Sequence, residues 1–130
     1  MKLASIRIVT NDLERLIGFY EQLTGVVATR LAPDFAEVRL AGAVLAISTE
    51  RMVKQFNAGV CVSAANRSAI LELQLDRADE VDGVHARLAG ARADIAMAPT
   101  TMPWGNRSLL LRDPDGNVIN VFARPPHTAQ

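Results

Sequence analysis

The sequence has one cysteine, no long apolar run and no excess of charge, and each shortage excludes a class of protein. Cys61 alone can form neither an intramolecular disulfide nor a thiolate metal site, and we expect it to be a small buried residue. No apolar run approaches the roughly 20 residues that span a bilayer, and the N-terminus lacks the apolar core of a signal peptide. We therefore expect a cytoplasmic protein without a membrane partner.

The charges balance, since 14 Lys and Arg residues stand against 14 Asp and Glu residues. A general nucleic-acid binder normally has a basic excess or a basic stripe, and this chain has neither, so we expect no nucleic-acid partner. Of the 130 residues, 49% are apolar and 22% are charged, which is typical of a folded chain. This length suits one compact domain or two small repeated modules.

The chain repeats a pattern with an offset of 65 residues. This offset aligns five pairs of residues: Ile6 with Leu71, Ile8 with Leu73, Gly18 with Gly83, Leu23 with Leu88, and Gly25 with Gly90. Each copy begins with alternating apolar and polar residues, which predict a strand, followed by an apolar stripe at helical spacing. The duplication is the strongest indication of the architecture.

The predicted elements follow the same order in both copies. The first copy has a strand at about 3–9 and a helix that starts after Asn11, the predicted N-cap, and ends at Gly25. The second has a strand at 70–75 and a helix at about 78–88, which Gly90 is expected to end. Three further strands are predicted in each copy, at about 26–31, 35–40 and 43–48, and at about 94–98, 107–112 and 118–122. Residues 50–66 lack a clean period and are predicted to connect the two modules (about 1–57 and 67–125), with a helix at the start.

The first strand of each module has one polar side. Arg7 in the first module and Glu72 in the second lie opposite the apolar residues that should pack on the helices. Asn120 is a polar residue inside an otherwise apolar strand. Two modules that curve these polar sides inward would form a trough for a small ligand.

Three segments resemble the vicinal oxygen chelate superfamily, which includes glyoxalase I, the bleomycin-resistance proteins, the fosfomycin-resistance enzymes and the extradiol dioxygenases. They are NDLERLIGFYEQLTG (11–25), PWGN (103–106) and DPDGNVINVF (113–122). The resemblance implies an α+β fold in which two paired βαβββ modules form a curved mixed sheet around a central cup, within one domain over residues 1–130. It also implies a homodimer.

The resemblance further implies where the ligands stand in metal-dependent members of the superfamily. In this sequence the positions are held by Ser5, Ile70, Asn120 and either Ala46 or Ser48. None offers the carboxylate or imidazole that divalent cations normally take. A register shift of two residues would replace Ile70 by Glu72, but one carboxylate does not make a site. The sequence therefore predicts no metal and no cofactor.

The two histidines do not alter this prediction. His85 lies at the edge of the apolar stripe of the second helix, where a half-exposed side chain is expected, and His127 lies in the tail after the last strand. Neither has a His-x-x-x-His spacing or a nearby carboxylate pattern that would indicate a metal site.

Four residues are predicted to bind a ligand: Arg7, Glu72, Trp104 and Asn120. Arg7 would hold a carboxylate or phosphate and Glu72 a donor, or these two charges would pair across the module interface. Trp104, the only tryptophan, is either a lid that stacks on the ligand or an anchor that packs its loop on the sheet edge. Asn120 is predicted to donate or accept hydrogen bonds on the floor of the trough. Arg107, just after the Trp104 loop, is expected in solvent.

The favoured hypothesis is a metal-free protein of the glyoxalase/bleomycin-resistance type that binds a small organic molecule of unknown identity. One alternative is a metal-dependent lyase, transferase or dioxygenase of the same superfamily. Another is a metal-free enzyme that uses Glu72 or Arg7 for acid–base chemistry. The balanced charge argues against a cationic drug such as bleomycin and favours a neutral or anionic ligand.

Overall fold

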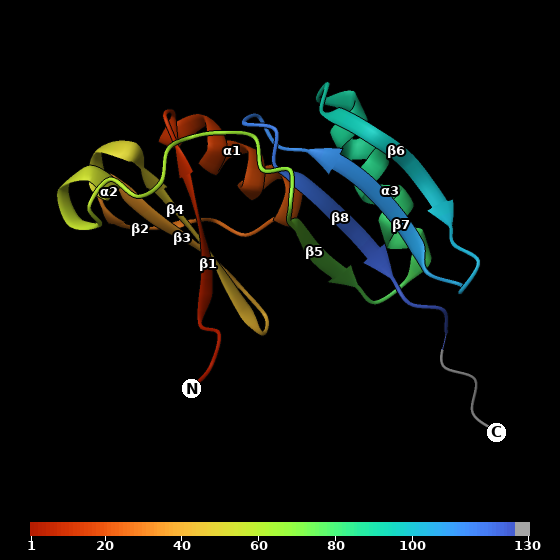
Figure 1. The fold of residues 1–130 in the computed structure, drawn as a ribbon. Coiled ribbons are helices and arrows are strands. Elements are labelled where there is room, and N and C mark those ends of the chain that lie inside the picture. The colour runs from red at the N-terminus through yellow and green to blue at the C-terminus, as the bar shows by residue number, and fades with distance from the viewer. Residues whose placement is uncertain (127–130) are drawn as a thin grey trace. The chain divides into compact units, whose positions relative to one another are not determined.

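A computed structural model describes residues 1–126 as two compact units, Met1–Ala65 and a second that starts at Asn66 (Figure 1). Each unit contains a four-stranded mixed sheet and follows the order strand, helix, three strands. The predicted α+β fold and the predicted duplication of this pattern are confirmed.

The first unit comprises β1 (Ser5–Thr10), α1 (Leu13–Thr24), β2 (Thr29–Ala32), β3 (Phe35–Leu40), β4 (Ala43–Thr49) and α2 (Glu50–Phe56). Its strand order is β1-β4-β3-β2, with β1 parallel to β4 and the other pairs antiparallel. The helix α1 packs on β3 and β4. Its buried side chains, spaced at three and four residues, are Leu13, Leu16, Ile17, Tyr20 and Leu23.

The N-cap of α1 is Asp12, so the prediction of Asn11 is wrong by one residue. The side-chain oxygen of Asp12 accepts a hydrogen bond from the backbone N–H of Arg15 at 3.1 Å. The Asp12 N–H is itself bound by the Thr10 hydroxyl at 3.1 Å, which fixes the chain between the strand and the helix. The helix ends at Gly25, whose φ of 74° is in the left-handed region that favours glycine.

We call the side of each sheet that its first helix covers the helix face, and the other side the open face. In the first sheet, Ile6 pairs in register with Leu45, and Ile8 with Ile47, so both lie on the helix face as predicted. Ile6 is nevertheless 47% exposed. It belongs to the edge strand β1, whereas α1 covers β3 and β4.

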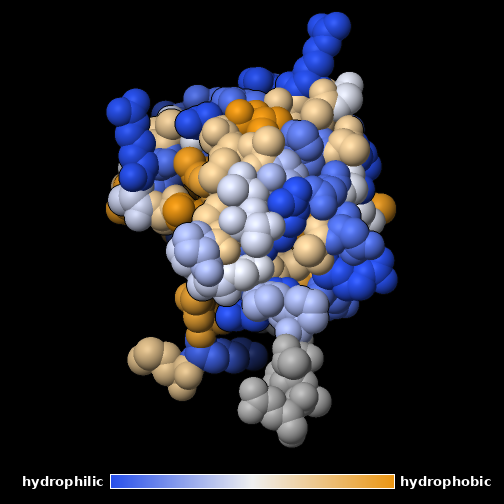
Figure 2. Space-filling view, turned by 90° about the vertical axis from the view of Figure 1, so that its right-hand side faces the viewer, coloured by the Kyte–Doolittle hydropathy of each residue, from blue (hydrophilic) through white to orange (hydrophobic). Residues whose placement is uncertain are grey.

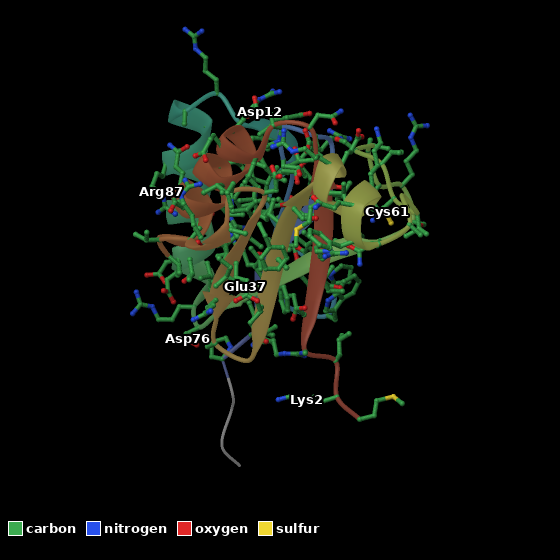
Figure 3. The ribbon with its side chains drawn as sticks, turned by 90° about the vertical axis from the view of Figure 1, so that its left-hand side faces the viewer. Lys2, Asp12, Glu37, Cys61, Asp76 and Arg87 are labelled. Carbon is green, nitrogen blue, oxygen red and sulfur yellow. The ribbon has the colours of Figure 1, made fainter. Side chains whose placement is uncertain are left out.

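The helix α2 covers part of the open face of the first sheet. It packs on β4 and β1, and Figure 3 shows it on the side opposite to α1. Val53 is the buried residue of α2, with 1% of its surface exposed. The Thr49 hydroxyl caps the helix by accepting a hydrogen bond from the Met52 N–H at 3.2 Å. Residues 50–66 are therefore helical at their start, as predicted.

The second unit comprises β5 (Ile70–Leu75), α3 (Ala78–Gly90), β6 (Asp94–Thr101), β7 (Arg107–Arg112) and β8 (Val118–Ala123). Its strand order is β5-β8-β7-β6, with β5 parallel to β8. The helix continues through Gly90 and its C-cap is Ala91, so Gly90 does not end it as predicted. The buried residues of α3 and of the helix face are Val81, Val84, Leu88, Leu109, Leu111, Ile119 and Val121.

The DPDG segment forms the turn between β7 and β8. One carboxylate oxygen of Asp113 accepts hydrogen bonds from the N–H groups of Asp115 and Asn117, both at 2.9 Å. The other accepts from the Asn117 side-chain amide at 2.8 Å. Gly116 has a φ of 90°, which a residue with a side chain rarely adopts. Asp113 and Gly116 therefore have a structural role in this turn.

No helix among residues 1–126 is long and apolar enough to cross a membrane. The longest of them is α3, with 13 residues. On the face of the molecule in Figure 2, hydrophilic and hydrophobic residues are interspersed.

Candidate functional site

Two of the predicted ligand-binding residues meet on the open face of the second sheet. Glu72 on β5 and Asn120 on β8 are partners in the parallel register. The Asn120 Nδ2 donates a hydrogen bond to the Glu72 Oε2 at 3.2 Å. The other amide atom, Asn120 Oδ1, is buried and has no hydrogen-bond partner among the described residues. Leaving a buried acceptor unpaired costs about 1–3 kcal/mol, so an N–H or O–H group of a ligand would be stabilising there.

The next positions on this open face are aromatic and then cationic. Phe122 follows Asn120 by two residues and pairs in register with Gln74 on one side and Ser108 on the other. The guanidinium of Arg124 lies over the Phe122 ring, 5.9 Å from the ring centroid. Sequence reasoning missed Arg124, which lies one residue beyond the end of β8.

Trp104 lies on the loop between β6 and β7, and 68% of its surface is exposed. The loop is closed by hydrogen bonds from the Met102 N–H to the Asn106 carbonyl at 2.7 Å, and from the Gly105 N–H to the Met102 carbonyl at 2.8 Å. Gly105 has a φ of 98°, and a Cβ there would lie 3.1 Å from the Pro125 ring. An anchor packed on the sheet edge would be mostly buried, so the exposed indole counts against that interpretation.

Arg7 lies on the open face of the first sheet and contacts the end of α2. Its Nη2 donates a hydrogen bond to the Oδ1 of Asn57, the C-cap of α2, at 2.7 Å. Its register partner on β4 is Ala46, which is buried. Arg7 thus has a structural contact within its own unit, and its role toward a ligand stays a prediction.

Arg107 pairs with α3, contrary to the expectation that it lies free in solvent. Its Nη2 lies 2.7 Å from the Oδ1 of Asp82. The hydrogen bond and the negative charge of Asp82 stabilise the guanidinium and raise the pKa of Arg107. The side chain therefore ties β7 to its helix.

Three other side chains bear on the earlier expectations. His85 is half-exposed on α3, as predicted, and His127 lies outside the described residues. Cys61 is exposed, so the expectation that it is buried is wrong. It belongs to the segment between α2 and β5, where residues 60–66 form no helix or strand that could enclose it.

The match to a family model covers most of the chain. The model of the Glyoxalase/Bleomycin resistance protein/Dioxygenase superfamily matches residues 2–121. The chain belongs to this superfamily. No curated protein matches it.

Solved structures of the superfamily have the same fold. A glyoxalase-related enzyme from Fulvimarina pelagi has a TM-score of 0.82 and 25% identity, and the alignment covers 98% of this chain and 93% of that one. A glyoxalase/bleomycin resistance protein/dioxygenase from Nocardioides has a TM-score of 0.79 and 21% identity, with 100% and 90% covered. A lactoylglutathione lyase from Agrobacterium tumefaciens has a TM-score of 0.74 and 18% identity, with 94% and 92% covered. The last two likenesses show the fold alone.

The positions at which the resemblance to the superfamily implies metal ligands do not fit a divalent cation here. Ile70 and Ala46 have no donor atom, and Ser5 and Ser48 have only neutral hydroxyls, which are weak ligands. The Asn120 amide is bound to Glu72. Over residues 1–126, no group of three or more His, Cys, Asp or Glu side chains is placed to hold an ion.

Proposed function

We propose that this protein binds a small organic molecule on the open face of the second sheet, without a resident metal ion. The observation that supports this most is the buried Asn120 Oδ1, which has no partner among the described residues, on a side chain whose Nδ2 donates to the Glu72 carboxylate. A buried polar atom without a partner lowers stability, and a ligand that donates a hydrogen bond to it would remove this cost.

The three predicted ligand-binding residues of the second unit have proposed roles. Glu72 and Asn120 accept hydrogen bonds from the ligand, and Trp104 stacks on it as a lid from the loop that precedes β7. Arg7 belongs to the first unit, where it donates to Asn57, and no role toward this ligand is assigned to it. No step of bond making or breaking is assigned to these residues.

A metal-dependent lyase, transferase or dioxygenase is the second candidate. It is favoured by membership of the superfamily and by the name of the lactoylglutathione lyase among the similar folds. It is disfavoured by the donor atoms at the ligand positions. Metal analysis of the purified protein separates the two candidates: a stoichiometric bound transition metal would support the enzyme and contradict the metal-free binding protein.

We also propose a homodimer, as the resemblance to the superfamily implied. Support comes from one edge strand of each sheet, β1 and β5, which carry the exposed apolar residues Ile6 and Ile70. Edge strands of this kind tend to associate unless they are covered. Light scattering on the eluting protein should give twice the mass of one chain, and a single-chain mass over a range of concentrations would contradict the dimer.

Binding is tested by a thermal-shift screen of small-molecule fragments, followed by calorimetric titration of those that raise the melting temperature. Glu72→Gln should weaken fragments with an N–H donor by roughly ten-fold or more, because a hydrogen bond to a charged acceptor is lost. Asp94→Asn, which changes an exposed carboxylate on β6, is the matched control and should leave the affinity unchanged. A screen without any stabilising fragment would overturn the proposal, as would equal affinities for both variants.

A further inference from the structure

We infer that the ligand is a zwitterion, whose ammonium group binds Glu72 and Asn120 and whose carboxylate binds Arg124. This inference rests on the proposed function. It adds a ligand class and a binding residue that the sequence did not reveal.

The Glu72 end of the open face offers acceptors only. The Asn120 amide must turn its Nδ2 toward Glu72, because the reverse orientation would place Oδ1 against the carboxylate. This orientation leaves Asn120 Oδ1 as a second acceptor without a donor. Within the second unit, no described Lys or Arg lies within ion-pair distance of Glu72. An ammonium group has three N–H donors and a positive charge, which suit both atoms.

The Arg124 end offers donors only. Three other arginines of the second unit have carboxylate partners, namely Arg77 with Asp79, Arg107 with Asp82, and Arg112 with Asp94. Arg124 is exposed and has no acidic partner among the described residues, and its guanidinium contacts the Phe122 ring instead. A guanidinium that lies over a ring face can still donate from its N–H groups to a carboxylate.

An apolar side chain separates the two ends of the open face. Asn120 is in β8, whereas Arg124 follows the last residue of this strand and its guanidinium lies over the Phe122 ring. Phe122 lies between them and is only 8% exposed, so the middle of the ligand would pass over a surface without a charge. The open face thus fits an extended molecule with an apolar centre. The balanced charge of the whole chain favoured a neutral or anionic ligand, but the charged groups on the open face determine which ligand class binds.

The probes are ω-amino acids of increasing chain length, compared with the alkylamines, the alkanoic acids and the methyl esters of matched length. Calorimetric titration should give the tightest binding for one chain length of the amino acid. Removal of either charged group should weaken binding roughly ten- to a hundred-fold, since each forms a charge-assisted hydrogen bond.

Variants of Arg124 assign the carboxylate end. Arg124→Gln should lower the affinity for the amino acid to that of the methyl ester, and Arg124→Lys should retain part of the difference. Arg92→Gln, which changes an exposed arginine after α3, is the control and should change nothing.

The outcomes separate this inference from the proposed function. Equal binding of amino acid and ester, with an unchanged affinity in Arg124→Gln, would overturn the inference, while a loss in Glu72→Gln would leave the proposed function standing. Fragment ligands that bind the open face but carry neither an amine nor a carboxylate would also overturn the inference. If no compound binds and Glu72→Gln has no effect, both are wrong.

Discussion

The two units have the same order of elements but use the open faces of their sheets differently. The 65-residue offset aligns Arg7 with Glu72, and their register partners are Ala46 and Asn120. In the first unit, Ala46 is buried on the face that α2 covers. In the second unit the chain continues past β8 without a helix in its described part, and the corresponding position holds a polar amide. One open face serves packing, and we propose that the other serves recognition.

The comparison extends to the polar atoms that lack partners. Ser48 in the first sheet and Asn120 in the second each have a buried oxygen without a hydrogen bond among the described residues. Ser48 has no exposed surface, whereas Asn120 is partly exposed through atoms other than its buried Oδ1. Each face has a buried oxygen without a partner, and we propose that a ligand can approach Asn120 but not Ser48.

The largest effect is expected from removing the contact of α2 with the first sheet. Val53→Ala should lower the free energy of unfolding by about 2 kcal/mol, since it deletes two buried methyl groups and leaves a cavity. Urea denaturation measures this change. Val62→Ala, at an exposed position beyond the same helix, should change it by less than about 0.5 kcal/mol. Equal effects of the two substitutions would mean that α2 does not stabilise the open face.

The next prediction compares the two polar atoms directly. Ser48→Ala should raise the free energy of unfolding by about 1 kcal/mol, because it removes a buried hydroxyl without a partner, and it should leave ligand affinity unchanged. Asn120→Leu should change stability by no more than about 1 kcal/mol but should weaken binding at least roughly ten-fold. Denaturation and calorimetry on both variants test this. If Ser48→Ala weakened binding as much as Asn120→Leu, the distinction between the two faces would be lost.

A smaller effect on stability is expected from the loop before β7. Trp104→Ala should change the free energy of unfolding by less than about 0.5 kcal/mol, because the indole is mostly exposed, and should weaken ligand binding several-fold. The corresponding turn of the first unit, at Pro33 and Asp34, carries no tryptophan. Since Trp104 is the only tryptophan, its fluorescence should change on ligand binding in the native protein. A marked loss of stability together with unchanged binding would instead restore the anchor interpretation.

The sequence predicts the fold well because the fold depends on local periodicity. Strands β3, β5 and β7 have the predicted bounds, since alternation and turn residues delimit them on both sides. The N-cap of α1 was misplaced by one residue because Asn11 and Asp12 are both good caps, and the contact of Thr10 with Asp12 decides between them. Cys61 was expected to be buried from its residue type, which does not reveal whether the segment around it is covered.

The candidate site was predicted only in part, because it depends on contacts between strands far apart in sequence. Alternation placed Glu72 and Asn120 on the same face, but their register, which joins residues 48 positions apart, comes from the structure. The contact of Arg7 with Asn57 could not be predicted, because the short sequence of α2 does not reveal where this helix packs. Arg124 lies beyond the end of β8, where a strand pattern stops predicting direction.

The smallest effect is expected from pH, at a second contact that holds α2 to the first unit. Arg51 of α2 donates a hydrogen bond from Nε to the Oδ2 of Asp34, in the turn between β2 and β3, at 2.9 Å. This hydrogen bond lowers the pKa of Asp34 in the folded state. A carboxyl whose folded pKa lies below its unfolded value stabilises the fold above the unfolded value, which is about 4, and this stabilisation is lost as the pH falls through the folded pKa. In Arg51→Gln, the decline in melting temperature below about pH 4 should be slightly shallower than in the native protein. Arg92→Gln, in the second unit, should leave this decline in melting temperature unchanged. Identical acid profiles for all three proteins would show that this contact does not hold α2.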